Sequence, residues 1–132
     1  MFSLNTFLGL VNLKTQIENI STHFKLPVVV AINRFSTDTD AELDLVKSES
    51  LKFGAFDAVI TRGYELGGAG VVDLAKAVER ATKEASPGQL TLLYDNADSI
   101  KKKIEKVATN IYRAGSVEYS ELAEKKIQVS FY

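Results

Sequence analysis

The sequence predicts an α/β protein with a partial three-layer, doubly wound sheet, in which two or three parallel strands are flanked by helices. Two observations support this prediction. Short β-branched runs alternate with longer stretches whose apolar residues recur at helical spacing. The strand runs are continuously apolar, which is typical of parallel strands buried on both faces and joined by right-handed crossovers. With 132 residues, 45% of them hydrophobic, residues 1–132 are expected to form a single domain.

The first half of the chain predicts two helices around one strand. Helical spacing predicts a helix over residues 4–24, and the run LPVVVAIN over residues 26–33 predicts a buried strand. After a polar loop, Asp38 or Thr39 is suited to cap a helix that ends at Gly54. The apolar face expected for the first helix comprises Leu4, Phe7, Leu8, Val11, Leu13, Ile17, Ile20 and Phe24.

A second strand is predicted over residues 56–61, followed by a Gly-rich loop at 63–70 that opens another helix. The Ser-Pro-Gly sequence at 86–88 ends that helix. Residues 90–94 are interpreted as either a third strand or an extended connector. The face of this helix expected to be buried carries Val71, Leu74, Ala75 and Val78.

Two helices are predicted in the remainder of the chain. Asp98 or Ser99 begins one that ends at residues 114–115, and Ser120 begins a short last helix. A sheet of two or three parallel strands leaves long unpaired edges, which natural proteins pair or cover. The segment therefore resembles part of a larger doubly wound domain.

Composition excludes several classes of function. Sixteen basic against 17 acidic residues give a net charge of −1, so nucleic acid is not an expected partner. The chain has no Cys and a single His, His23, which excludes thiolate chemistry and disfavours both a zinc site and a Ser-His-Asp triad. No apolar run is long enough to span a membrane, and the N-terminus lacks the basic region of a secretory signal. We expect a cytoplasmic protein.

Ligands in open α/β sheets bind at the carboxyl ends of the strands, which directs attention to two loops. In the first, Asn33-Arg34-Phe35-Ser36 resembles a base-reading Asn-Lys-x-Asp element, with Ser36 in place of the Asp. Two interpretations stay open for this loop: ligand contact, or helix capping and turn formation.

The second loop places Gly67, Gly68 and Gly70 at a helix N-terminus, where free N–H groups favour an anion. The run is too short for a Gly-x-Gly-x-x-Gly motif, and Gly-Lys-Ser/Thr is absent from the chain. Tight turning without a ligand is the alternative interpretation.

Several segments of the chain together resemble the formate–tetrahydrofolate ligase family. They are Asn12-Leu13-Lys14, LPVVVAINRF at 26–35, TDTDAEL at 37–43, Gly67-Gly68-Ala69-Gly70 and Val117-Glu118-Tyr119-Ser120. The resemblance covers most of the chain but only an interior portion of a longer enzyme. It implies a P-loop NTPase-like sheet and a reaction that converts ATP, formate and tetrahydrofolate to 10-formyltetrahydrofolate, ADP and phosphate.

The resemblance also implies what this segment contributes to that reaction. The family's ATP with Mg²⁺ would be held mainly by a phosphate loop outside this region, so the isolated chain, a truncated or split ligase, is expected to be inactive and to carry no catalytic residue or metal ligand. The alternative is a non-catalytic interaction module that associates with itself or with a fuller ligase chain. The residues expected on the nucleotide side are Asn33, Phe35, Thr37, Asp38 and Thr39, with Tyr64, Gly67 and Gly68 on a further ligand-side loop.

Overall fold

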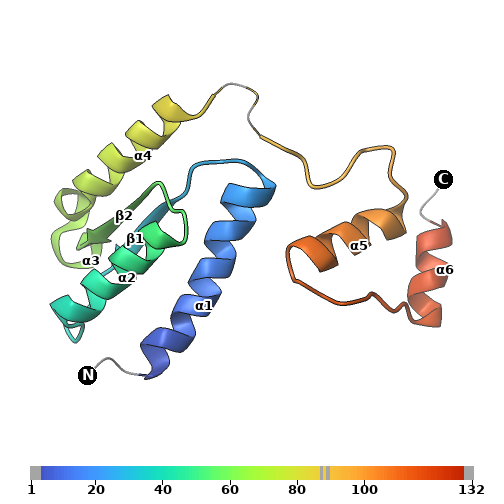
Figure 1. Ribbon diagram of the computed structural model, residues 1–132, viewed down its shortest axis with the longest axis horizontal. Helices are drawn as coiled ribbons and strands as arrows, with labels where there is room; N and C mark the ends of the chain where they lie inside the picture. Colours follow the sequence, from blue (N-terminus) through green and yellow to red (C-terminus); the bar gives the residue numbers. More distant parts are fainter. Residues whose placement is uncertain (1–3, 87, 89, 130–132) are drawn as a thin grey trace. The chain divides into compact units, whose positions relative to one another are not determined.

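The computed structural model describes residues 4–86, 88 and 90–129, with the side chains of residues 4–7 left out. The chain divides into two compact units, Met1–Thr91 and Leu92–Tyr132, and each is described by itself (Figure 1). The assignment of the whole chain to a single domain stays a prediction.

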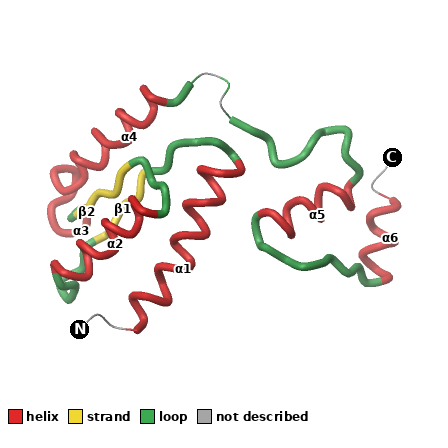
Figure 2. Tube along the Cα trace, viewed as in Figure 1, coloured by secondary structure: helices red, strands yellow, loops and turns green. Residues whose placement is uncertain are grey.

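The first unit is built on two parallel strands, β1 (Val29–Asn33) and β2 (Asp57–Thr61), drawn in yellow in Figure 2. Their register pairs Val29 with Asp57 and Asn33 with Thr61. Both predicted strands are confirmed, although β1 begins three residues later than expected. Pro27 lacks a backbone N–H to donate to a neighbouring strand, and pairing starts where the Val28 carbonyl accepts a hydrogen bond from Phe56 N–H at 2.8 Å.

The crossover between the strands is helix α2 (Asp40–Lys52), whose first turn is closed by a capping box. The Thr39 hydroxyl accepts from Glu42 N–H at 3.3 Å, and the Glu42 carboxylate accepts from Thr39 N–H at 3.4 Å. Thr39 rather than Asp38 is therefore the cap. The predicted end is confirmed, because Gly54 follows the helix with φ of +96°, a left-handed conformation suited to glycine.

Helices cover both faces of this sheet, which confirms an α/β architecture. Figure 1 shows α4 (Val72–Glu84) on one face and α2 on the other, beside α1 (Leu4–Glu18). Helix α1 continues as a π-helical segment, Asn19–His23, so the predicted helix is present but changes its form near its end. A P-loop NTPase-like strand order stays a prediction.

Two buried clusters of the first unit lie between the sheet and the helices α1 and α2, and Ala77 and Ala81 of α4 are buried as well. One buried cluster comprises Ile17, Val28 and Ala55, and the other comprises Ile32, Leu43 and Ala58. The predicted apolar face of the first helix is wrong at Leu8, Val11 and Ile20, which are exposed. Two more of its members, Leu4 and Phe7, have side chains outside the described residues.

The segment predicted as a Gly-rich loop is largely helical. It forms α3 (Gly63–Leu66) and a 3₁₀ segment (Gly67–Val71) that leads directly into α4. Helix α4 buries Ala77 and Ala81, so the predicted face is wrong at Ala75, which is exposed, and at Val78, which is 45% exposed. The helix ends at Glu84, shortly before the Ser-Pro-Gly sequence predicted to end it. Pro87 of that sequence lies outside the described residues.

The second unit contains α5 (Ile100–Asn110) and α6 (Glu121–Val129), so both predicted helices are present. The predicted end of the first at residues 114–115 is wrong, because α5 ends at Asn110. Ser99 caps α5 by accepting from Lys102 N–H at 3.3 Å. Residues 90–94 form no strand, so the extended connector is the correct alternative. Within the described residues, no helix is both long and apolar enough to cross a membrane.

Candidate functional site

A pocket of about 490 Å³ lies at the carboxyl ends of the two strands. Arg34 directly follows β1 and Arg62 directly follows β2, and the strands are tied together here because Arg34 N–H donates to the Thr61 carbonyl at 3.0 Å. This is the edge of an open α/β sheet at which ligands bind. The pocket is lined by Arg34, Phe35, Ser36, Arg62, Tyr64 and Glu65.

Two exposed aromatic side chains dominate the lining. Phe35 is 59% exposed and Tyr64 is 94% exposed. Burying large aromatic side chains is favourable, and solvent-facing rings in one pocket offer faces against which a planar ring can stack. The pocket therefore has the side chains needed to bind a flat, partly apolar group.

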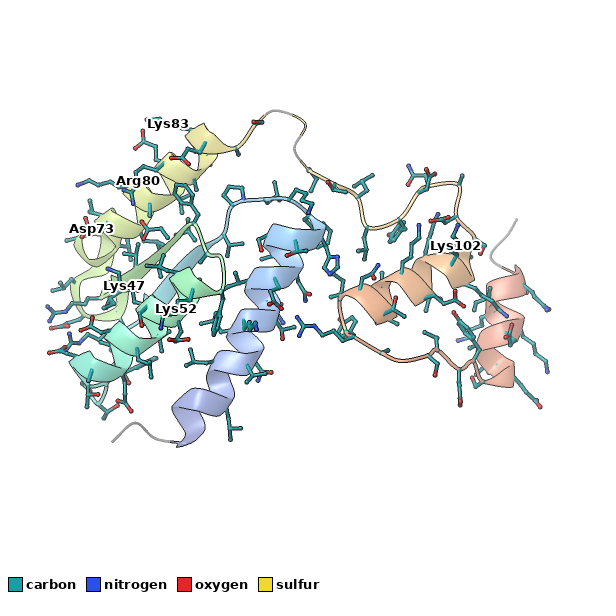
Figure 3. The ribbon with its side chains drawn as sticks, viewed as in Figure 1. Lys47, Lys52, Asp73, Arg80, Lys83 and Lys102 are labelled. Atoms are coloured by element: carbon teal, nitrogen blue, oxygen red, sulfur yellow. The ribbon has the colours of Figure 1, made fainter. Side chains whose placement is uncertain are left out.

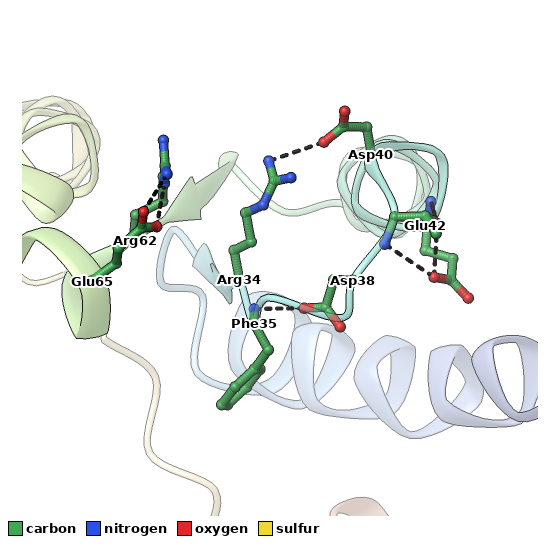
Figure 4. Close-up of polar contacts among 8 residues, drawn as sticks. Arg34, Phe35, Asp38, Asp40, Glu42, Arg62 and Glu65 are labelled. Carbon is green, nitrogen blue, oxygen red and sulfur yellow. Dashed lines mark hydrogen bonds and ion pairs between the residues drawn. The ribbon is translucent and has the colours of Figure 1, made fainter.

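The backbone at Phe35 is held by Asp38 (Figure 4). Phe35 N–H donates to Asp38 Oδ2 at 2.8 Å, and Asp38 N–H donates back to the Phe35 carbonyl at 3.1 Å. Figure 4 shows the Phe35 ring pointing away from this carboxylate. Asp38 thus fixes the backbone conformation of the loop from which the Phe35 ring projects.

Two ion pairs flank the pocket and involve both arginines (Figure 4). The Arg62 guanidinium donates to both carboxylate oxygens of Glu65, at 2.9 and 2.7 Å. Arg34 Nη1 lies 2.9 Å from Asp40 Oδ1 at the start of α2. Solvent-exposed pairs of this kind contribute little to stability, about 0–1 kcal/mol each, but bidentate geometry restricts where the guanidinium lies.

The structure brings together some of the residues predicted for the site. Phe35 and Tyr64 line one pocket although they follow different strands. Asp38 and Thr39 act in the loop closure and the helix cap instead. Predicted residues that do not line this pocket are Asn33, Thr37, Asp38, Thr39, Gly67 and Gly68.

Sequence reasoning missed the two arginines, Ser36 and Glu65 as members of the site. A signal for the arginines was present, because each directly follows a strand and the strand ends meet in a parallel sheet. For Glu65 the signal was weaker, since only the helical geometry of α3 brings its carboxylate to Arg62.

A metal site would place its own requirements on the side chains of the pocket. No group of three or more potential metal ligands occurs among the residues that the structure describes. The carboxylate of the pocket lining, Glu65, is already engaged on both oxygens by Arg62. These residues do not fit a Mg²⁺ ion, which needs oxygen ligands in near-octahedral geometry.

The sequence, compared with known proteins, decides the family. A profile of the formate–tetrahydrofolate ligase family matches residues 5–130. The chain belongs to this family. Sequence identities between the chain and individual relatives agree with this assignment.

The chain is 49% identical over 121 residues to formate–tetrahydrofolate ligase from Spinacia oleracea, which covers 92% of this chain and 18% of the relative. It is 45% identical over 120 residues to the ligase from Thermotoga maritima, with 91% and 21% covered. The mitochondrial C-1-tetrahydrofolate synthase of Saccharomyces cerevisiae is 46% identical over 119 residues, with 90% and 12% covered. The chain thus spans about a fifth or less of the length of these ligase relatives.

Proposed function

We propose that the pocket at the strand ends binds the planar heteroaromatic ring of a ligase substrate, stacked on Phe35 and Tyr64. The observation that carries this proposal is the presence of two largely exposed aromatic side chains in one pocket of about 490 Å³. Each stacking contact adds about 0.5–1.5 kcal/mol beyond buried area. Two such contacts support binding of the ring.

Two substrates of the family reaction carry a planar ring of this kind: ATP carries adenine, and tetrahydrofolate carries a pterin. Both are flat and both carry polar edges, so the pocket chemistry is shared. The assignment to the nucleotide, with Asn33, Phe35, Thr37, Asp38 and Thr39 on its side, stays a prediction. Tyr64, Gly67 and Gly68 stay predicted as a neighbouring ligand-side loop.

The chain is proposed to contribute substrate binding to the ligase reaction without completing it. The sequence contains no Gly-Lys-Ser/Thr motif for the phosphates, and the pocket residues do not fit Mg²⁺. We expect the purified chain to release no ADP when supplied with Mg-ATP, formate and tetrahydrofolate. Measurable release that depends on both formate and folate would overturn this part of the proposal.

Equilibrium binding of Mg-ATP and of tetrahydrofolate, measured separately by calorimetry, tests the ring site and identifies its source. Phe35→Ala and Tyr64→Ala should each weaken binding of the accepted ligand about two- to tenfold, as loss of one stacking contact predicts. Tyr64→Phe keeps the ring and should bind as the parent chain does. Tyr112→Ala, which removes a 78% exposed tyrosine of the second unit, is the matched control. Unchanged affinity in both alanine variants would refute the site.

A second candidate function is that of an interaction module, and it is favoured by the sheet. In the described residues the sheet has two strands, so each strand has one edge without a neighbour. Exposed parallel edges are normally paired or covered. We propose that they pair with a second copy or with a fuller ligase chain. Sedimentation velocity of the pure chain and of its mixture with a complete ligase should show association, and a monomer in both would contradict it.

The compartment is also a proposal. Relatives are described both as mitochondrial, in Saccharomyces cerevisiae, and as cytoplasmic, in Mus musculus. We propose the cytoplasm for this chain. Fluorescence microscopy of the tagged chain in its own cells tests this, and a mitochondrial signal would contradict it.

A further inference from the structure

The turn that carries Tyr64 is closed by contacts between its two ends. Arg62 N–H donates to the Gly70 carbonyl at 3.0 Å, so the residue before the turn is bonded to one near its end. We call this hydrogen bond, together with the close approach of the Gly70 and Arg62 backbones, the Arg62–Gly70 closure. It makes residues 63–69 a helical turn whose two ends are fixed to one another.

Position 70 requires glycine because the backbone of Arg62 lies too close to leave room for a Cβ atom. A Cβ atom at position 70 would lie 2.5 Å from the Arg62 carbonyl carbon and closer still to its oxygen, whereas real Cβ atoms essentially never come within 3.0 Å of another such atom. The obstacle is backbone, which cannot rotate away as a side chain can. Gly68, two residues earlier, has nothing within 4 Å of the same position. The two glycines therefore differ in what an added methyl group would meet.

The same Arg62 residue also organises the start of the turn. Its carbonyl accepts from Glu65 N–H at 3.1 Å and from Leu66 N–H at 2.8 Å, and its guanidinium holds the Glu65 carboxylate. Tyr64 lies between these bonded residues in the chain. Because its own side chain is 94% exposed, few packing contacts fix it, and its place in the pocket depends on the turn.

We propose that Gly70 is a positioning residue, which holds Tyr64 at the pocket through the Arg62–Gly70 closure. This inference rests on the proposed ring-binding function. A turn that spends only a fraction of its time in the binding position lowers the apparent affinity by that fraction. Opening the closure should therefore weaken binding while the strands and long helices stay formed.

The chain contains no tryptophan, so Tyr64→Trp places a single fluorescent reporter on the turn. Gly70→Ala and Gly68→Ala are each added to this background. In the Gly70→Ala protein we expect lower fluorescence anisotropy, since the reporter moves more freely, and Mg-ATP or tetrahydrofolate affinity about tenfold weaker. The Gly68→Ala protein should match the Tyr64→Trp parent in fluorescence anisotropy, because an added methyl group at position 68 meets no other atom. Far-ultraviolet circular dichroism should be the same in all three.

Each outcome decides the inference. Unchanged anisotropy in a folded Gly70→Ala protein would overturn it. If Gly70→Ala abolishes the folded circular dichroism spectrum, amide hydrogen exchange of the Tyr64→Trp parent decides instead, because the closure protects Arg62 N–H. An Arg62 amide that exchanges as fast as an exposed one would overturn the inference. If the parent binds neither Mg-ATP nor tetrahydrofolate, the proposed function fails, and the anisotropy of the glycine variants still tests the positioning role.

Discussion

Asp38 accepts a 2.8 Å hydrogen bond from the backbone N–H of Phe35, and its own N–H donates to the Phe35 carbonyl at 3.1 Å. This reciprocal pair makes the aspartate part of the support for an exposed aromatic ring. A carboxylate that closes a turn in this way fixes the backbone from which the neighbouring ring projects.

Asp38→Ala should therefore loosen the Phe35 loop. We expect faster amide hydrogen exchange at Phe35, because its acceptor is removed, and a loss of about 1 kcal/mol of stability. Substrate affinity should fall as well. Asp44→Ala, at an exposed position on α2, is the control and should leave Phe35 exchange unchanged. Parental exchange at Phe35 in the Asp38→Ala protein would show that the carboxylate does not support the loop.

The neighbouring threonines differ in what their hydroxyl groups do. Thr39 caps α2 within a capping box, whereas Thr37 is exposed in the preceding turn. Thr39→Ala should lower the free energy of unfolding by about 1 kcal/mol, and Thr37→Ala should change it by less than about 0.5 kcal/mol. Urea denaturation followed by circular dichroism measures both. Equal effects would mean that the cap does not stabilise α2.

These local features explain which parts of the fold could be predicted from the sequence. The β-branched runs and the Thr39-x-x-Glu42 signal each act within a few residues, so both strands and α2 were predictable. The buried face of α4 was not, because the buried side chains are the small Ala77 and Ala81 and not the larger Val78, and the spacing of large apolar residues does not single out alanines.

The position of the candidate site was predictable from the sequence, but the set of residues that line it was not. Strand ends identify the loops, yet the meeting of Phe35 with Tyr64 in one pocket depends on the register that pairs Asn33 with Thr61. That register is set by packing between elements and not by any short motif.

Helix α1 is expected to be held to the sheet mainly through Ile17, which is 1% exposed. Ile17→Ala removes buried methyl and methylene groups and leaves a cavity, so the free energy of unfolding should fall by about 2–5 kcal/mol. Val11→Ala, on the same helix but at a 62% exposed position, should change it by less than about 0.5 kcal/mol. Similar losses at both positions in chemical denaturation would contradict the described packing of α1.

Lowering the pH should reduce the stability of the second unit, because Asp98 then becomes protonated. Hydrogen bonds from Lys102, at 2.8 Å, and Lys106, at 2.6 Å, hold the pKa of the Asp98 carboxyl well below its usual range. A depressed folded-state pKa contributes stability that is present above the unfolded pKa of about 4 and is lost as the pH falls below it.

Asp98→Asn should therefore reduce the loss of stability of α5 between pH 7 and pH 2. Amide resonances of α5 followed during thermal unfolding at the two pH values measure this difference. Asp73→Asn, at an exposed position on α4 (Figure 3), is the control and should keep the parental acid sensitivity. An acid sensitivity of α5 that Asp98→Asn leaves unaltered would contradict the role of the lysine pair.

The most direct test of the ring-binding site is a two-dimensional amide NMR titration of the labelled chain with Mg-ATP and, separately, with tetrahydrofolate. The account predicts that one of these ligands shifts the resonances of Phe35 and Tyr64 and of their neighbours in the pocket, while those of α5 stay in place. Resonances at the strand ends that do not respond to either ligand, or shifts confined to the second unit, would contradict it.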